Sequence, residues 1–489
     1  MNRLNLCLLA ALLVAGCSGS GDTDTPAEKE TDRVDFTSYL TTGDGKRLME
    51  KGGFEFGNPF GVGATTVTID KTETFQTIDG FGAAVTGATA YNLMQMSSDA
   101  RKAVLTEIFS RTEGLGSSLV RVSIGASDFS VNDEFTWCDK AGLENFAVHK
   151  EDSDWLFPVL KEIYAINPDV KIIASPWSAP LWMKCDNLSN KGAWYQWTSG
   201  QLNPDHYADY AEYFVKWIQT MEAEGFNIYA MTVQNEPLNR GNSMSMYMTW
   251  QEQRDFIRTA LGPAFKKAGI KTKILVFDHN YNYDDISDQR NYPLNIYADE
   301  EASAYVAGSA WHNYGGSVTE LKHIASGAPD KEIYFTEASI GTWNYDFKKC
   351  LYTDFNSIFI QTMLYGGKGV TLWNMILDSD KGPHRGAGAC STCYGAMTMA
   401  KGGAITERTT HYYDIAHASK VILPGAVRVG ASGSVPSGIS YAAFKNPDGS
   451  MAVIIANSGS SAANLVFKSA EEVFISIPAQ SIASLIWNE

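Results

Sequence analysis

Basic side chains are scarce in this chain of 489 residues. Lys and Arg number 39 against 55 Asp and Glu, which gives a formal net charge of −16. Binding to nucleic acid requires a positively charged surface, so this balance argues against a nucleic-acid partner. Apolar residues make up 44% of the chain and charged residues only 19%. A chain of this composition can bury enough apolar surface to fold, which excludes wholesale disorder.

Long apolar runs are also absent. After the N-terminal segment, no stretch reaches the roughly 18 apolar residues that are needed to span a membrane. Residues 1–16 have the pattern of an export signal, with Arg3 ahead of a short apolar run, Leu4 to Val14. Small residues precede Cys17, which is typical of a bacterial lipoprotein signal that is cleaved before a lipidated cysteine. An ordinary secretory signal with a chance cysteine is the alternative. We expect an exported lipoprotein of the outer membrane, at the cell surface or the periplasmic face, whose only membrane contact is this anchor.

Cysteine is sparse too, with seven in the whole chain. Cys390 and Cys393 are close enough in sequence to form a disulfide in an oxidising compartment. The same C-x-x-C spacing occurs in zinc and redox sites. A single copy, without a second cysteine pair or a spaced histidine pair, argues against structural zinc and leaves the pairing open.

Fixed-period repeats are not evident, but strands and helices alternate from residue 79 to residue 404. Seven short β-branched or aromatic runs are expected strands: Ser118–Ile124, Val170–Trp177, Ile228–Asn235, Lys273–Asp278, Ser309–Tyr314, Glu332–Ala338 and Gly369–Met375. A first strand near Gly80–Ala84 brings the count to eight. Eight β/α units predict an α/β fold, the closed (β/α)8 TIM barrel.

The pattern changes on both sides of this barrel. Residues 405–489 contain short strand patterns separated by turns, which predicts a β-sandwich. Residues 51–78 are β-rich as well, and we expect them to add strands to the same side domain. Residues 17–50 begin with a Gly-, Ser- and acid-rich run, and we expect them to form a flexible tether.

Two glutamates lie at the ends of expected barrel strands. Glu236 ends the fourth strand within Gln-Asn-Glu-Pro, and Glu337 ends the seventh within Phe-Thr-Glu-Ala. Catalytic residues of a TIM barrel lie at the C-terminal ends of its strands. A lone glutamate there is more often a helix N-terminal acid or a salt-bridge partner, but two that face one pocket are what glycoside hydrolysis requires. Burial and the like charge are expected to keep one proton on the acid.

Aromatic residues accompany these carboxylates and make up 12% of the chain. Trp177, Tyr314 and Trp373 lie at the ends of three further strands. Aromatic faces can stack on the C–H faces of sugars, and their N–H and O–H groups can bind hydroxyls. We therefore favour a sugar-binding cleft over ordinary core packing. The amide of Asn235, next to Glu236, is placed to hold a sugar 2-hydroxyl.

Taken together, these motifs resemble glycoside hydrolase family 30, a clan A family of retaining β-glycosidases with endo-β-1,6-glucanase and glucosylceramidase-like members. The resemblance runs from about Phe54 to the C-terminus and includes Asp79–Thr86, Val120–Val122, Ser127–Ser130, Ala174–Pro180, Gln234–Pro237, Gln253–Phe256, His312–Tyr314, Phe335–Ala338 and Trp373–Asn374.

The resemblance implies a role for each matching residue. Glu337 corresponds to the nucleophile and Glu236 to the acid/base. The other implied roles are a 2-hydroxyl contact for Asn235, a hydrogen bond to the carboxylates for Tyr314, sugar contacts for Trp177 and Trp373, and supporting positions for Arg121 and His312. The resemblance implies no metal and no organic cofactor.

Two departures from the glucosylceramidase-like pattern bear on the substrate. Those members carry an aspartate at the first strand end, where this chain reads Val85-Thr86-Gly87, and a tryptophan at the position of Asn313. Both changes favour a site that accepts a longer chain. We therefore expect a monomeric, retaining endo-β-1,6-glucanase that acts on β-glucan polysaccharide or oligosaccharide by double displacement. The alternatives are an exo-β-glucosidase or glucosylceramidase-type enzyme, another β-glycanase of the family, or a non-catalytic glycan-binding protein.

Overall fold

The computed structural model describes residues 36–52, 63–132, 134–385 and 388–489. The expected signal sequence and Cys17 lie outside these ranges. In the described part of the chain, no helix is both long and apolar enough to cross a membrane.

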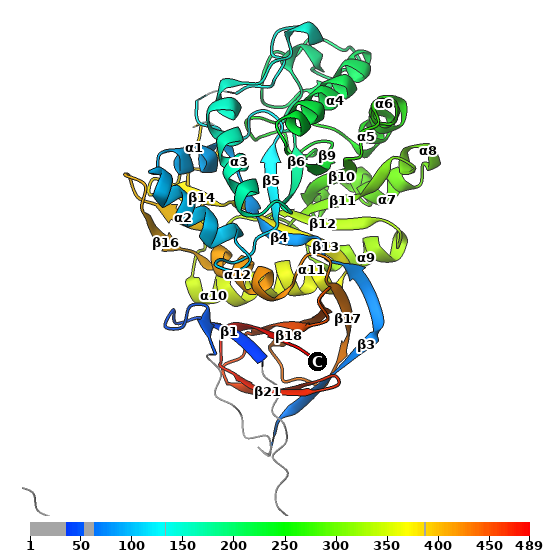
Figure 1. Cartoon of the computed structure of the whole chain (residues 1–489). Coiled ribbons are helices and arrows are strands. Elements are labelled where there is room, and N and C mark those ends of the chain that lie inside the picture. The colour runs from blue at the N-terminus through cyan, green and yellow to red at the C-terminus, as the bar shows by residue number, and fades with distance from the viewer. Residues whose placement is uncertain (1–35, 53–62, 133, 386–387) are drawn as a thin grey trace, which may run out of the picture.

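Eight parallel strands close into a barrel, as the sequence predicts (Figure 1). In chain order they are β4 (Gly80–Ala84), β5 (Leu119–Ser123), β6 (Lys171–Ser175), β9 (Ile228–Thr232), β10 (Lys273–Asn280), β11 (Val306–His312), β12 (Glu332–Glu337) and β13 (Gly367–Asn374). Because all the pairings are parallel, the C-terminal ends of the strands meet at one mouth.

The barrel interior changes from apolar to polar toward this mouth. A buried apolar layer consists of Leu119, Ile173, Ala230, Leu275, Ala310 and Tyr334. Side chains two residues apart on a strand point to the same face. The next inward positions on five of these strands are polar and fully buried: Arg121, Ser175, Thr232, His312 and Thr336.

Strand β10 departs from this alternation. Phe277 and Asp278 have φ angles of 73° and 72°, and the register between β10 and β11 shifts at the same place. The irregularity brings Asp278, rather than Phe277, into the polar layer, where Asp278 is fully buried.

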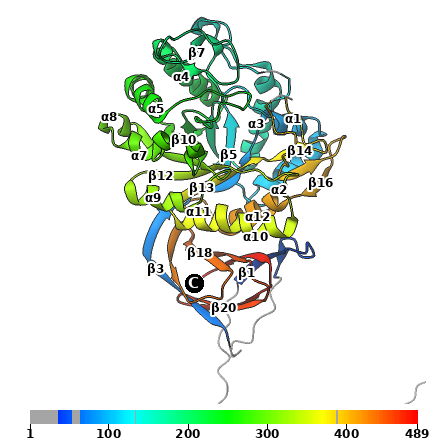
Figure 2. The same cartoon turned by 180° about the vertical axis from the view of Figure 1, so that it is seen from behind.

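Helices surround the barrel (Figures 1 and 2). They are α1 (Gly87–Met94), α2 (Ser98–Phe109), α3 (Phe157–Ile166), α4 (Tyr207–Ala223), α5 (Trp250–Phe256), α6 (Gly262–Ala268), α7 (Tyr292–Tyr297), α8 (Glu300–Ser303), α9 (Thr319–Gly327), α10 (Phe347–Asp354), α11 (Gln361–Leu364) and α12 (Thr410–Val421). Short sheets in the connecting segments comprise β7 (Lys184–Cys185) with β8 (Gln201–Leu202), and β14 (Ile376–Asp378) with β15 (Met397–Met399) and β16 (Ile405–Arg408).

A nine-stranded sheet built from both ends of the chain forms the side domain, seen below the barrel in Figure 1. Its strands are β1 (Phe36–Thr42), β2 (Glu50–Lys51), β3 (Thr65–Thr77), β17 (Val427–Ser432), β18 (Ile439–Lys445), β19 (Met451–Asn457), β20 (Ala463–Lys468), β21 (Glu472–Ile477) and β22 (Ser481–Trp487). Eight of them contribute to one apolar core, separate from that of the barrel. The predicted fold class is thereby confirmed.

Two predicted boundaries are wrong. The tether was expected to extend to residue 50, but β1 pairs with β22 along its whole length and buries Leu40. Its Ser- and Thr-rich sequence conceals a strand that is satisfied mainly by backbone pairing. Residues 405–489 are not all β either, because Thr410–Val421 forms α12, which contacts both β4 of the barrel and β22.

Candidate active site

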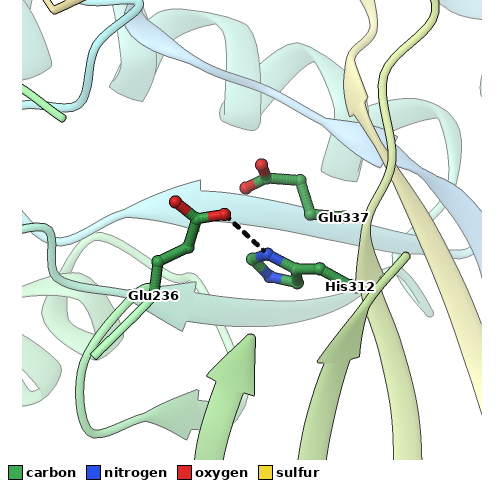
Figure 3. Close-up of side chains that lie close together, drawn as sticks. All are labelled: Glu236, His312 and Glu337. Carbon is green, nitrogen blue, oxygen red and sulfur yellow. Dashed lines mark hydrogen bonds and ion pairs between the residues drawn. The ribbon is translucent and has the colours of Figure 1, made fainter. Parts of the chain in front are cut away.

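The strand ends bring Glu236, His312 and Glu337 together (Figure 3). One carboxylate oxygen of each glutamate and one imidazole nitrogen of His312 all lie within 4.8 Å of one another. Both glutamates are only 6% exposed, and both line a cavity of about 440 Å³. Retaining glycosidases hold their two carboxyl groups about 5–5.5 Å apart, whereas inverting enzymes need roughly 6.5–9.5 Å. The observed proximity matches the retaining arrangement.

Glu337 is held at both of its oxygens. The guanidinium of Arg121 donates to Oε2 at 2.5 Å, and the hydroxyl of Tyr314 donates to Oε1 at 3.0 Å. Arg121 also donates to Asn235 Oδ1 at 2.7 Å and to Asp278 Oδ2 at 2.9 Å. A fully buried guanidinium between two carboxylates favours their ionised forms. This arrangement suits Glu337 to act as an anion in fixed orientation.

Glu236 has a different environment. Its Oε2 accepts hydrogen bonds from the amides of Asn239 and Asn242, both at 2.8 Å. Its Oε1 lies 3.4 Å from His312 Nδ1 and 3.9 Å from His279 Nε2. Glu236 therefore contacts two groups that can carry a proton, whereas Glu337 contacts a permanent cation.

Asp278 organises the polar layer beneath both glutamates. Its two oxygens lie 2.6–3.0 Å from donors on Arg121, Ser175, Thr232, His312 and Thr336. These contacts hold the pKa of the Asp278 carboxyl far below its usual range, although burial opposes them. No sequence motif marks Asp278 as functional, although it is the last residue of the fifth expected strand.

The protonation pattern differs from the expectation of a protonated acid. Burial would raise the pKa of the Glu236 carboxyl, but the hydrogen bond from His312 and the charge of His279 hold this pKa well below its usual range. Burial raises the pKa of Glu337, although His312 and Arg121 oppose this shift. Burial also opposes the charged form of His312, but Glu337, Asp278 and Glu236 together raise its pKa to about 9. These shifts favour the ionised form of Glu236 and the protonated form of His312.

Asp128 is a second functional candidate whose role is not evident from the sequence. It lines the cavity, and burial together with the charges of Glu337 and Glu236 raises its pKa to about 8. A carboxyl that is protonated at neutral pH can both donate and accept hydrogen bonds.

Glu236, His312 and Glu337 are close enough to ligate a metal ion together. However, both oxygens of Glu337 already accept hydrogen bonds, from Arg121 and Tyr314. The two nitrogens of His312 already contact carboxylates, Nδ1 that of Glu236 and Nε2 that of Asp278. A metal ion on His312 Nδ1 would have to replace the contact of this nitrogen with Glu236.

The expected sugar contacts lie at two depths. Tyr314 and Trp373 line the cavity. Trp177 is 1% exposed and stacks behind Trp373, with 5.2 Å between ring centres. Asn235, Arg121 and His312 are likewise buried behind the cavity wall. The structure therefore places these four residues to support the wall.

The first barrel strand ends without a carboxylate. The hydroxyl of Thr86 donates to Asn374 Oδ1 at 2.7 Å, and Thr86 is buried as the N-cap of α1. Thr86 is thus a structural residue, and the next residue, Gly87, stands where the glucosylceramidase-like pattern has its aspartate.

Comparison with known proteins gives consistent results. The TIM-barrel domain of glycosyl hydrolase family 30 matches residues 78–422, and the β-sandwich domain of the family matches residues 425–485. The endo-1,6-β-D-glucanase neg1 of Aspergillus fumigatus is 31% identical, with 88% of this chain and 89% of the relative covered. The lysosomal acid glucosylceramidase of Mus musculus is 28% identical, with 92% and 89% covered. The solved structure of the endo-β1,6-glucanase BT3312 is 48% identical with a TM-score of 0.89, over 93% of this chain and 99% of that one. The chain belongs to glycosyl hydrolase family 30.

Proposed function

We propose that this chain is an endo-β-1,6-glucanase that cleaves β-1,6-glucan with retention of configuration. The observation that carries the proposal is a pair of carboxylates at the retaining distance, in a chain 48% identical to an endo-β1,6-glucanase. The relatives include further endo-1,6-β-D-glucanases that are 31–33% identical.

In the first chemical step, Glu337 attacks the anomeric carbon and the bond to the leaving oxygen breaks. Arg121 and Tyr314 fix the orientation of the attacking carboxylate. Glu236 donates a proton to the leaving oxygen, and the adjacent imidazolium of His312 is the source of that proton. The product of this step is a covalent glucosyl-enzyme.

In the second step, a water molecule takes the place of the leaving group. Glu236 accepts a proton from this water while the oxygen attacks the anomeric carbon. The bond to Glu337 breaks, and Arg121 stabilises the carboxylate that returns. Two inversions give net retention.

Internal cleavage is favoured over exo action by the first strand end. Gly87 offers no carboxylate to hold the hydroxyls of a terminal sugar, and the hydroxyl of its neighbour Thr86 is already bonded to Asn374. Exo-β-glucosidase or glucosylceramidase-type action is the second candidate, supported by the similarity to the mouse enzyme. A purely glycan-binding role does not explain why both carboxylates are held in working geometry.

A time course on linear β-1,6-glucan tests the function. We expect a ladder of β-1,6-linked oligosaccharides from the earliest times, with newly formed reducing ends in the β configuration. Glu337→Gln, which preserves shape, should abolish the ladder. Glucose as the sole early product would indicate an exo-enzyme. Cleavage of glucosylceramide or xylan, with none of β-1,6-glucan, would refute the linkage assignment.

We also propose that lipid on Cys17 anchors a monomeric enzyme to the outer membrane. The sequence pattern around Cys17 supports this proposal. Cys17→Ala should move the enzyme from the membrane fraction to the soluble fraction. Retention in the membrane fraction would refute the anchor, and a dimer mass in light scattering would refute the monomer.

A further inference from the structure

Trp343 holds an indole ring at the open mouth of the catalytic cavity. The residue is 51% exposed and lines the same cavity as Glu236 and Glu337. Among the large apolar side chains of the described residues that are more than a third exposed, only Tyr314 and Trp343 line this cavity. Tyr314 is bonded to Glu337, so its position is explained. Leaving an indole in water forfeits the free energy of its burial, which a ligand could recover.

The position of Trp343 is fixed by its neighbours. The chain before it pairs with a short loop closed by the Cys390–Cys393 disulfide, with Thr342 N donating to Thr392 O at 3.0 Å and Tyr394 N donating to Ile340 O at 2.8 Å. The two half-cystines lie in the cavity wall as well. A disulfide-closed loop thus supports the segment that carries Trp343.

Gly341 provides the surface on which the ring rests. A Cβ added at Gly341 would lie 2.0 Å from Cζ3 and 2.5 Å from Cη2 of Trp343. The six-membered ring therefore packs directly against the bare backbone of Gly341, and half of the residue remains exposed. An indole supported in this way is preorganised, because a ligand need not order it on binding.

The surroundings of Trp343 match the chemistry of a sugar. Ser339, Asn280 and Asp284 lie in the same wall and provide polar atoms beside the apolar ring. Trp373 already provides an aromatic face deeper in the cavity, where it stacks on Trp177. The cavity therefore has two aromatic surfaces, one at depth and one at the mouth.

We propose that Trp343 is a stacking platform for the glucosyl unit next to the one held between Glu236 and Glu337. The proposal rests on the proposed function, in which the substrate is a β-1,6-linked chain rather than a single sugar. The indole would cover the C–H face of that neighbouring unit, and the disulfide-closed loop would keep the ring in place. Trp343 would then increase kcat/KM for substrates of more than one sugar unit without taking part in bond cleavage.

The test compares two substrates that differ in whether they reach the mouth. A β-1,6-linked glucotetraose extends beyond the catalytic pair, whereas β-D-glucosyl fluoride has a leaving group of one atom. Trp343→Ala should lower kcat/KM for the tetrasaccharide by about 10- to 50-fold, the loss expected from half of a large aromatic surface. Its kcat/KM for the fluoride should stay within about twofold of the parent enzyme, which corresponds to about 0.4 kcal/mol when a tenfold change is 1.4 kcal/mol.

Three further variants sharpen the result. Trp343→Phe keeps an aromatic ring and should recover most of the activity on the tetrasaccharide. Gly341→Ala leaves Trp343 in the chain but displaces its ring, so it should lose tetrasaccharide activity selectively. Tyr195→Ala removes an exposed aromatic that does not line the cavity and should behave like the parent enzyme.

Equal kcat/KM of Trp343→Ala and the parent on the tetrasaccharide would overturn the proposal. An equal loss on both substrates would also overturn it, because Trp343 would then support the catalytic pair itself. Failure of the parent enzyme on every β-1,6-glucan, with turnover of the fluoride, would instead refute the proposed function. In that case the glucan that the parent does accept replaces the tetrasaccharide in the same comparison.

Discussion

Asp278→Asn is the perturbation that probes the polar layer of the barrel most severely. The change preserves shape but removes the negative charge that faces Arg121 and His312. The change also replaces one hydrogen-bond-accepting oxygen of the Asp278 carboxylate with an NH2 group, which would then point at neighbouring hydrogen-bond donors. Three hydroxyls, from Ser175, Thr232 and Thr336, donate to the same carboxylate.

The magnitude follows from burial. Removing one partner of a buried ion pair typically costs about 3–5 kcal/mol, because the other charge is left uncompensated. Arg121 keeps its bond to Glu337, which limits this loss, but the NH2 group then opposes neighbouring donors. We expect Asp278→Asn to lower the free energy of unfolding by about 3–5 kcal/mol, within the roughly 5–15 kcal/mol that a domain possesses.

The pH dependence gives an independent readout. The pKa of His312 is raised to about 9 in the folded protein, partly by Asp278. A raised pKa contributes stability that is fully present below the ordinary histidine value of about 6.5 and is lost as pH rises through the folded value. Asp278→Asn should reduce this loss of stability between about pH 6.5 and pH 9.

Urea unfolding of the parent and Asp278→Asn at several pH values measures both effects. Asp284→Asn is the matched control, because Asp284 is partly exposed and makes no contact with Arg121. A change below about 1 kcal/mol, together with an unchanged pH dependence, would refute the reasoning that Asp278 holds this layer together.

Three other predictions concern catalysis. In the pH profile of kcat/KM, activity should fall on the acid side as Glu337, whose pKa is raised, becomes protonated. It should also fall on the alkaline side near pH 9, as His312 loses its proton. If His312→Gln leaves the alkaline fall in place, the assignment to His312 is contradicted. Tyr314→Phe should lower kcat on β-1,6-glucan about tenfold, since one hydrogen bond to a carboxylate is lost; unchanged steady-state kinetics would refute this role. Glu236→Ala should lower kcat on β-1,6-glucan by about 10² or more. The rate of the first step on a dinitrophenyl β-glucoside should be spared, because this leaving group departs without a proton. An equal loss of the burst-phase rate on the dinitrophenyl substrate would contradict the acid role.

Much of the fold follows from local patterns. Seven of the eight barrel strands are visible as β-branched or aromatic runs, and the position of functional residues at strand ends locates Glu236 and Glu337. Strand β1 is hidden because its Ser- and Thr-rich sequence resembles a linker until it pairs with β22.

The less predictable features depend on three-dimensional neighbours. Asp278 enters the polar layer through an irregularity with positive φ, which no alternation of residue types reveals. The proton on His312 depends on three carboxylates that come from separate strands and loops. Trp343 lies in a loop with no periodic signal, and its exposure is set by the bare backbone of Gly341.

Trapping the covalent intermediate tests most directly whether Glu337 and Glu236 perform a double displacement. Incubation with 2-deoxy-2-fluoro-β-glucosyl fluoride should add one fluoroglucosyl group to the protein, as measured by intact mass. Peptide mapping should place this group on Glu337, and Glu337→Gln should remain unlabelled. A label on Glu236 or another residue, or labelling of Glu337→Gln, would contradict the assignment of Glu337 as the nucleophile.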